Sequence, residues 1–211
     1  IKKLGIKVRM QKNYCEIVGN GINGFKYKKN LTINAKNSGT LSRLILGLLI
    51  KSPKKIKIIG DKSLSKRDFS RVTVPLGKFG VKFSYKIKNK LPLTILGTQS
   101  AKGIKYLENK GSAQCKSSIM LAALNASGIT SIKAKKSRNH SELLFKYLKI
   151  PIKVRKAKRF DFIDIKKPKK INAFNYQIPG DISSSAFFMV LTTLANDSKL
   201  LIKNVNINPS R

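Results

Sequence analysis

The strongest constraint on the fold is a local pattern that occurs three times along the chain. Each occurrence starts with a cluster of Ser, Gly, Thr or Asn residues, continues into an apolar segment, and ends in a short Lys/Ile-rich segment typical of a strand. The polar clusters begin near residues 37, 112 and 181. Their spacing of roughly 70 residues exceeds the period of ordinary solenoid repeats, so each copy must be nearly a subdomain.

The apolar segments of the three copies predict helices. In the first copy, apolar residues recur at the i, i+3, i+4, i+7 and i+8 spacing of one helix face: Leu41, Leu44, Ile45, Leu48 and Leu49. The apolar segments of the second and third copies cover 119–124 and 186–191. The strands that follow the three helices are expected at 56–58, 130–133 and 200–203.

A second helix follows in each complete copy. Asp68 and Asn139 each come directly after an arginine, and both residue types favour the N-cap position of a helix. Pro75 should kink the first of these helices or lie in its opening turn. Alternating apolar residues then predict two more strands. The unit is therefore β-α-β-α-β-β, present in two copies with the start of a third, and the fold class is α/β.

The polar clusters place side-chain donors at the N-termini of the predicted helices. A helix N-terminus offers unpaired backbone N–H groups and a partial positive charge to an anion. Hydroxyl and amide groups there would add to this site: Thr40, Ser112, Gln114 and Ser137. Arg67 and Arg138 could each form paired hydrogen bonds to a carboxylate or phosphate. Capping explains any one serine, but each cluster is longer than a cap requires, so we predict a site for a small anion.

The charge of the chain is strongly basic, with 45 Lys and Arg against 9 Asp and Glu in 211 residues, a net charge of +36. Such a balance suggests nucleic acid. However, most of the basic residues are lysines scattered among Ile and Asn, as compositional drift would produce, and aromatic residues interleaved with Arg are not seen along the chain. We therefore expect no specific nucleic-acid partner, although a basic nucleic-acid-binding module stays open as an alternative.

Other classes of protein are also disfavoured by the composition. No stretch reaches the length of apolar residues that a membrane span needs, and the chain opens without a signal-peptide core, so we expect a soluble, cytoplasmic protein with no membrane partner. Cys15 and Cys115 lie far apart in the sequence, and with the single His140 they make neither a disulfide framework nor a metal site.

Several segments, taken in order, carry a resemblance to one enzyme family. They are Asn-Ser-Gly-Thr-Leu-Ser-Arg at 37–43, Gly-Asp-Lys-Ser-Leu-Ser-Lys-Arg at 60–67, Ser-Ala-Gln-Cys-Lys-Ser at 112–117 and Ser-Arg-Asn-His-Ser-Glu at 137–142, continued at 179–184 and 206–211. With these motifs the chain resembles the 3-phosphoshikimate 1-carboxyvinyltransferases, also called enolpyruvylshikimate-phosphate synthases. The Ser-Ala-Gln-x-Lys-Ser motif resembles that of the bacterial subgroup that includes glyphosate-tolerant members. The resemblance spans nearly the whole chain.

The resemblance implies one lobe of a two-lobed enolpyruvyl transferase, each lobe being built from three of the repeated units. Residues 1–172 would form the first lobe, incomplete at its N-terminus, and residues 173–211 the crossover and the start of the second lobe. The family transfers the enolpyruvyl group of phosphoenolpyruvate to the 5-hydroxyl of shikimate 3-phosphate and releases phosphate. No metal or organic cofactor is implied, and the full-length protein is expected to be a monomer.

The resemblance also assigns binding roles to individual residues. Those expected to hold shikimate 3-phosphate are Ser112, Ala113, Gln114, Ser137 and Arg138, with His140 as a weaker candidate. Those expected to contact or line the site of phosphoenolpyruvate are Gly39, Thr40, Arg67 and Gln114. Because tolerant members of the subgroup commonly have Ala where this chain has Gly39, we expect ordinary glyphosate sensitivity of the parent enzyme.

The expected catalytic acid and base residues of the family lie outside this chain. We therefore expect the 211 residues alone to be catalytically silent. His140 and Glu142 lack a partner in the sequence that would support acid–base work, and Asp181 is interpreted as the cap of the third helix. A UDP-sugar enolpyruvyl transferase shares the repeated unit and stays open as a second alternative, although the segments at 112–117 and 137–142 do not resemble it.

Overall fold

The computed structural model describes residues 1–22 and 24–210, which fall into two compact units, Ile1–Ile171 and Asn172–Arg211. The first unit opens with a short 3-10 helix, Lys2–Leu4, and an antiparallel hairpin of β1, Lys7–Met10, and β2, Cys15–Val18. Two successive copies of a larger unit follow.

The two copies have the same order of elements. The first copy contains β3 (Leu31–Asn34), α1 (Gly39–Leu48), β4 (Ile56–Ile59), a short α2 (Lys62–Ser65), α3 (Ser70–Gly77), β5 (Lys82–Tyr85) and β6 (Leu93–Leu96). The second copy contains β7 (Lys105–Glu108), α4 (Ala113–Ala123), β8 (Ile129–Lys135), α5 (His140–Tyr147), β9 (Ile152–Lys156) and β10 (Phe160–Lys166). Apart from the extra turn α2, each copy is the predicted β-α-β-α-β-β unit.

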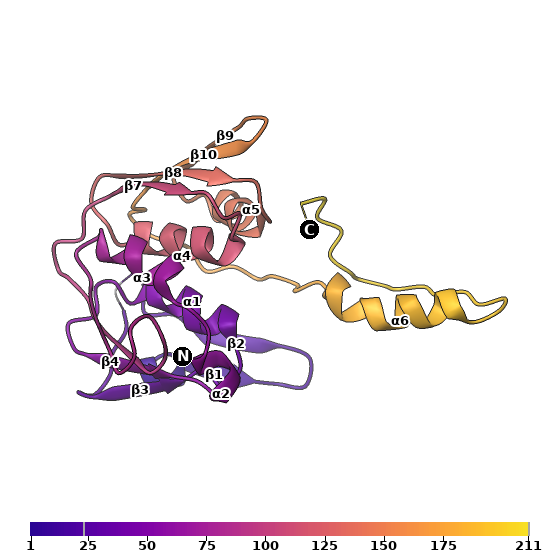
Figure 1. The fold of residues 1–211 in the computed structure, drawn as a ribbon, viewed down its shortest axis with the longest axis horizontal. Coiled ribbons are helices and arrows are strands. Elements are labelled where there is room, and N and C mark those ends of the chain that lie inside the picture. Colours follow the sequence, from indigo (N-terminus) through magenta and orange to yellow (C-terminus); the bar gives the residue numbers. More distant parts are fainter. Residues whose placement is uncertain (23, 211) are drawn as a thin grey trace. The chain divides into compact units, whose positions relative to one another are not determined.

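The strand order of the two sheets is also the same, and Figure 1 labels the four strands of the second sheet. The sheets run β3-β4-β6-β5 and β7-β8-β10-β9. In each, the first two strands are parallel and the remaining neighbours are antiparallel. A parallel pair requires a crossover connection, which contains α1 in the first copy and α4 in the second. The last two strands of each copy are antiparallel and are joined by a hairpin. The repeat therefore extends to the topology of the sheets.

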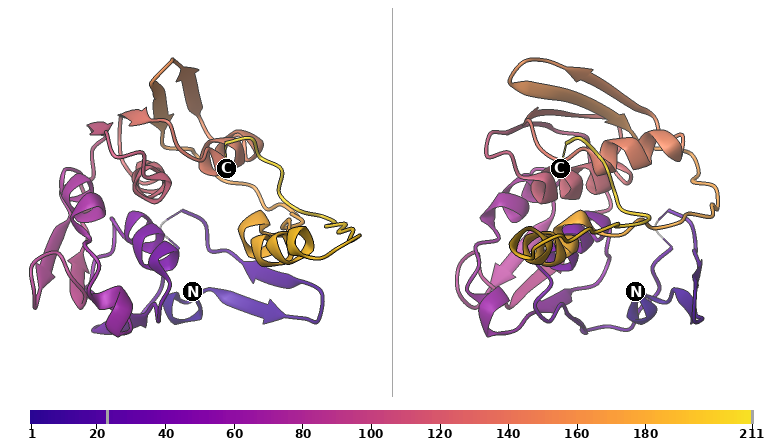
Figure 2. Two further views of the ribbon diagram at one scale, coloured as in Figure 1. Left: turned by 45° about the vertical axis from the view of Figure 1, so that its right-hand side comes forward. Right: turned by 90° about the vertical axis from the view of Figure 1, so that its right-hand side faces the viewer.

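Apolar residues from both copies form one core. Helices α1, α3 and α4 lie between the two sheets (Figure 2), and inward-facing strand residues such as Ile56, Ile58, Ile163 and Ile165 are fully buried. Helix α4 is the most enclosed helix, because every residue from Cys115 to Ala123 except Leu121 is buried. Gly47 allows α1 to approach α4 closely, since a Cβ at that position would lie 2.1 Å from the carbonyl oxygen of Ser118.

Side chains cap the helices that carry the polar clusters. The hydroxyl of Ser38 accepts a hydrogen bond from the backbone N–H of Leu41 at the start of α1, and Ser112 does the same for Cys115 in α4. Asp61 caps α2 by accepting from Leu64 N–H. These bonds fix where each helix begins.

Of the two predicted caps of the second helices, Asp68 is wrong by one residue and Asn139 is confirmed in position only. The carboxylate of Asp68 accepts from Ser70 N–H, but the N-cap position of α3 is Phe69, one residue later. Asn139 is the N-cap of α5, yet its side chain makes no capping bond. Its φ of −109° and ψ of 22° lie outside the extended region from which a cap side chain reaches back to the helix.

Pro75 lies inside α3 rather than in its opening turn. Proline lacks the N–H that would bond to the carbonyl four residues earlier, which belongs to Arg71. The thiol of Cys115 donates to that carbonyl oxygen at 2.6 Å instead. The interruption in α3 is thus compensated by a bond from α4.

The second unit contains α6, Ile182–Leu194, which Asp181 caps by accepting from Ser183 N–H, as predicted. The predicted strand at 200–203 is wrong: the segment has no strand structure, and a single bridge joins Gly180 to Val205 nearby. A strand needs a partner along its length, and no second strand is assigned among the described residues of this unit. None of the helices in the described ranges has the length and apolar character that crossing a membrane requires.

Candidate functional site

The N-termini of α1 and α4 are joined by the side chain of Gln114. Its amide nitrogen donates to the hydroxyl of Thr40 at 2.8 Å, and its amide oxygen accepts from the guanidinium of Arg43 at 2.9 Å. Thr40 and Gln114 are each the second residue of their helix, so the two repeats hold equivalent positions side by side. The orphan N–H groups of two helices consequently lie close together.

A cavity of about 370 Å³ opens beside this junction. It is lined by residues of both copies: Arg43, Arg67, Asp68, Arg71, Val72, Ser112 and Gln114. Three guanidinium groups and one carboxylate therefore surround the space, giving it a positive charge. Arg67 and Ser112, which lie 45 positions apart in the sequence, are brought into one lining by the contact between the repeats.

Gly39 is buried at the first turn of α1 and lies under two of these arginines. A Cβ at Gly39 would be 2.9 Å from Nη1 of Arg43 and 3.0 Å from Nη1 of Arg67. The missing side chain thus allows both guanidinium groups to lie against the helix start. This close approach gives a local reason for glycine at the position.

The clustered charges change the titration of the site. Burial, followed by the charges of Arg67 and Arg71, lowers the pKa of Arg43 from its ordinary value. The hydrogen bonds from the side chain and backbone of Ser70 lower the pKa of Asp68, and the nearby arginines lower it further. The guanidinium of Arg43 also lies 5.3 Å from the ring centre of Phe69. Mutual repulsion of the arginines is the property that a bound anion would relieve.

The polar run that begins α4 fastens that helix to its neighbours. Gln114 bonds to α1, the Cys115 thiol bonds to α3, and the Ser118 hydroxyl donates to the carbonyl of Arg43 in α1. Between them, Lys116 and Ser117 reach α5. Successive residues on a helix point about 100° apart, so a run of polar residues serves several neighbours at once. The length of this polar cluster led to the prediction of an anion site. The contacts with neighbouring helices account for most of that length.

Two contacts tie α4 to α5. The ammonium of Lys116 lies 2.6 Å from Oε1 of Glu142, with the two side chains 0% and 6% exposed. The hydroxyls of Ser117 and Ser141 form a hydrogen bond of 2.6 Å. Glu142 is therefore the partner of a buried lysine, a structural role that the sequence did not reveal.

The segment before α5 lies next to the start of α4. The carbonyl oxygen of Lys136 is 3.4 Å from the position of a Cβ on Gly111, so Ser112 and Ser137 follow neighbouring residues. The buried Oγ of Ser137 and Nε2 of His140 have no hydrogen-bond partner in the described part of the chain. Arg138 is exposed. These three residues do not line the 370 Å³ cavity itself.

The structure thus brings together most of the predicted site residues. Gly39, Thr40, Arg67, Ser112 and Gln114 surround or border the cavity, and Ala113 lies between the last two at the start of α4. Sequence reasoning missed Arg43 and Arg71. Each lies four residues after a predicted site residue, Gly39 and Arg67 respectively, and for Arg43 this is about one turn of α1. That spacing was the available signal.

Comparison with known proteins now assigns the chain to a family. The family model described as EPSP synthase (3-phosphoshikimate 1-carboxyvinyltransferase) matches residues 1–211. The chain belongs to the EPSP synthase family. The α/β fold with mixed sheets agrees with this assignment.

Relatives of this EPSP synthase chain include the 3-phosphoshikimate 1-carboxyvinyltransferases of Streptococcus pyogenes serotype M2 (strain MGAS10270) and serotype M1. Each is 38% identical to it over 212 residues, which cover 100% of this chain and 48% of the relative. A solved structure of EPSP synthase from Acinetobacter baumannii superimposes with a TM-score of 0.83 at 34% identity, covering 100% of this chain and 47% of that one. The chain spans about half the length of the relatives it matches.

Proposed function

We propose that this chain supplies the substrate-binding half of an enzyme that transfers the enolpyruvyl group of phosphoenolpyruvate to the 5-hydroxyl of shikimate 3-phosphate, releasing phosphate. The observation that carries the proposal is the cavity in which Arg67 and Ser112 of two different repeats face the same space with Arg43, Arg71 and Gln114. Both substrates are anions, and the cavity has the charge and the donors that anions require.

Each residue has a distinct role in this proposal. Arg67 holds the carboxylate or phosphate of phosphoenolpyruvate through paired bonds, and Gln114 orients it with Thr40. Ser112 and the start of α4 at Ala113 bind shikimate 3-phosphate. Ser137, whose buried hydroxyl oxygen has no partner among the described residues, donates to its phosphate, assisted by Arg138. Holding two like-charged reactants in a shared orientation removes several kcal/mol from the barrier.

The proposal extends to the whole enzyme. Residues 1–172 belong to the first lobe, and residues 173–211 form the crossover to a second lobe, which supplies the catalytic acid and base. The full-length enzyme is a monomer in the cytoplasm. Transfer to a UDP-sugar is less well supported, because the names of the relatives and the family match concern shikimate 3-phosphate.

Calorimetric titration of the chain with phosphoenolpyruvate and with shikimate 3-phosphate tests the proposal. We expect saturable binding of both, weakened about ten- to hundredfold for phosphoenolpyruvate by Arg67→Gln, because one bidentate charged contact contributes on the order of 1.5–3 kcal/mol. Arg9→Gln is the matched control, since Arg9 pairs with the exposed Glu16 on the hairpin. Equal weakening by both variants would contradict the proposed site, as would the absence of any saturable binding.

A rate assay tests whether this chain alone can transfer the enolpyruvyl group. We expect the chain alone to transfer no enolpyruvyl group, since it holds the binding groups without the proposed acid and base. Measurable transfer by the purified chain would show that the catalytic groups lie within these 211 residues.

A further inference from the structure

The two sheets have the same strand order, so the residues on their outer faces can be compared directly. The two faces differ in the number of cations that they carry. Each sheet turns one face to the helices and one to solvent, and side chains alternate between the faces along every strand. In the second sheet, the outward residues of β7, β8, β9 and β10 include six cations: Lys105, Lys133, Lys135, Lys153, Arg155 and Lys166. We call this surface the basic sheet face.

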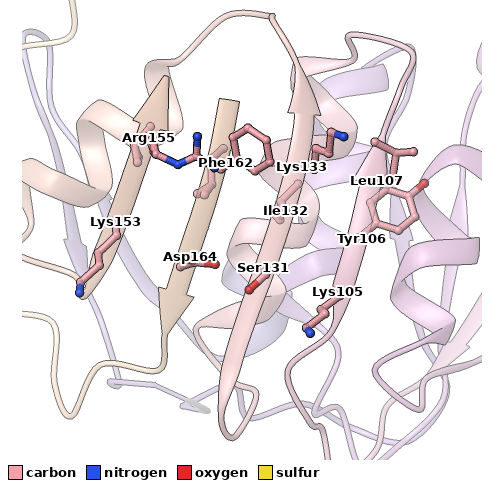
Figure 3. Close-up of a pocket in the computed structure, with 12 residues that line it drawn as sticks. Lys105, Tyr106, Leu107, Ser131, Ile132, Lys133, Lys153, Arg155, Phe162 and Asp164 are labelled. Atoms are coloured by element: carbon pink, nitrogen blue, oxygen red, sulfur yellow. The ribbon is translucent and has the colours of Figure 1, made fainter. Parts of the chain in front are cut away.

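The basic sheet face is organised in rows that cross the strands (Figure 3). One row pairs Leu107 with Lys133, Lys133 with Phe162, and Phe162 with Arg155. The next row contains Lys105, Ser131, Asp164 and Lys153. Side chains of both rows line a hollow of about 650 Å³, larger than the cavity between the helix starts. Asp164 is the single carboxylate in that lining.

The aromatic and cationic groups of this face are in direct contact. The guanidinium carbon of Arg155 lies 4.0 Å from the ring centre of Phe162, a close cation–π stack. The ammonium of Lys133 is 4.9 Å from the ring centre of Phe160 and 5.8 Å from that of Phe162. These contacts orient the charged heads above the sheet, where a further planar or anionic group can meet them.

The equivalent face of the first sheet provides an internal comparison. Its central row is Thr32, Lys57, Thr94 and Ser84, and the neighbouring outward pair is Lys82 with Leu96. Among the outward residues of these four described strands, two are cations and none is aromatic. Compositional drift toward lysine codons would place lysines on the outer faces of both sheets alike. The concentration of cations and rings on the second sheet therefore needs another cause.

We propose that the basic sheet face binds single-stranded nucleic acid, with the phosphates on its lysines and a base stacked at Arg155 and Phe162. Proteins that bind single strands combine a positive surface with aromatic platforms. The sequence argued against such a partner because no aromatic–arginine alternation runs along the chain. The alternation runs across strands instead, through residues such as Lys133, Phe162 and Arg155, and becomes visible only once the register is known.

Other polyanionic partners fit this face less well. An anionic membrane is bound by an amphipathic helix or by protruding apolar groups beside the cations, whereas the cations here line a hollow in a sheet. A DNA duplex is read by an element that enters a groove, and the hollow recedes from the surface. Two cations on one strand, such as Lys133 and Lys135, are about 7 Å apart, a spacing suited to successive phosphates of an extended strand.

Fluorescence anisotropy with a labelled oligo-U strand, titrated with the full chain, tests the proposal. We expect Lys133→Ala/Arg155→Ala to weaken binding about tenfold and to reduce the salt slope by about 0.7, because Lys133 contacts a phosphate, at about 0.7 per contact on a single strand, whereas Arg155 stacks on a base. Lys57→Ala/Lys82→Ala is the matched control, since it removes two cations from the outer face of the equivalent sheet. It should weaken binding less than about twofold, because neither lysine lies on the basic sheet face and no phosphate contact is lost.

A third variant separates stacking from charge. Phe162→Leu keeps the charge and most of the apolar volume, so it should weaken oligo-U binding about fivefold, as loss of one stacked base predicts, without changing binding to heparin. The proposal is overturned if the two double variants weaken oligo-U equally, if Phe162→Leu affects both polyanions alike, or if a duplex or an anionic vesicle binds more tightly through this face. Each variant's thermal unfolding confirms that it is folded.

Discussion

At the scale of single residues, the site depends on contacts that sequence could predict only in part. Arg67, Ser112 and Gln114 were predictable because each lies at or near the start of a helix with a polar cluster, whereas Gly39 was indicated by the family resemblance. The pairing of Gln114 with Arg43 was not, because it depends on the distance between two helices from different repeats. The ion-pair role of Glu142 was hidden for the same reason.

Substitution of Gly39 tests the close approach of the arginines. In Gly39→Ala, the added Cβ must displace the guanidinium groups of Arg43 and Arg67, which are flexible ends that can move. We expect stability to change by less than about 1 kcal/mol, because alanine favours a helix over glycine, while affinity for phosphoenolpyruvate falls severalfold. Gly77→Ala in α3 is the control, since its Cβ would meet nothing within 4 Å. Urea unfolding and calorimetry measure both quantities, and unchanged affinity in Gly39→Ala would refute the reasoning.

Cys115 should make stability depend on pH in the alkaline range. Burial, together with the charge of Glu108, raises the pKa of its thiol from 9.0 to about 12. Above pH 9 the unfolded chain releases this proton and the folded chain keeps it, so the stability present at lower pH is lost progressively between about 9 and 12.

The matching comparison uses Cys115→Ser, which keeps a donor for the carbonyl of Arg71 but does not titrate in this range. Both proteins carry Cys15→Ser to remove the exposed thiol. From pH 8 to pH 10.5, the protein that retains Cys115 should lose roughly 1–2 kcal/mol more unfolding free energy than the Cys115→Ser variant does. Parallel urea-unfolding curves for the two proteins across this range would show that the buried thiol is not the cause.

At the scale of elements, the β-α-β-α-β-β unit followed from the recurring pattern of polar cluster, apolar helix and strand. The shared strand order of the two sheets confirms it. Sequence failed where an element depends on a neighbour: the segment at 200–203 has strand-like residues but no partner strand in the described part of its unit. One cap position also shifted, since α3 begins one residue later than predicted and Phe69, not Asp68, is its N-cap.

The buried pair of Lys116 and Glu142 should be strongly coupled. Lys116→Met or Glu142→Leu alone leaves a charge without its partner in a site that is 0% and 6% exposed, and we expect a loss of about 3–5 kcal/mol for Lys116→Met. The double variant Lys116→Met/Glu142→Leu should recover most of that loss, since a packed apolar pair avoids the cost of burying charge. Urea unfolding measures the cycle, and additive losses would argue against the ion pair.

At the scale of the whole molecule, two repeats facing each other produce the candidate site. Neither repeat contains it alone: Arg43, Arg67 and Arg71 come from the first, and Ser112 and Gln114 from the second. The net charge of +36 indicated polyanions in general, but only the fold shows that cations gather in two distinct places, the cavity between the helix starts and the basic sheet face.

The most direct test of the account is a map of backbone amide shifts in the ¹⁵N-labelled chain titrated with shikimate 3-phosphate and phosphoenolpyruvate. We expect saturable shifts concentrated at the amides of Gly39, Thr40, Ala113 and Gln114 and at the segment around Ser137, with little change on the outer strands of either sheet. Shifts spread over surface lysines without saturation, or confined to the sheet faces, would contradict the claim that the paired helix starts form the anion site.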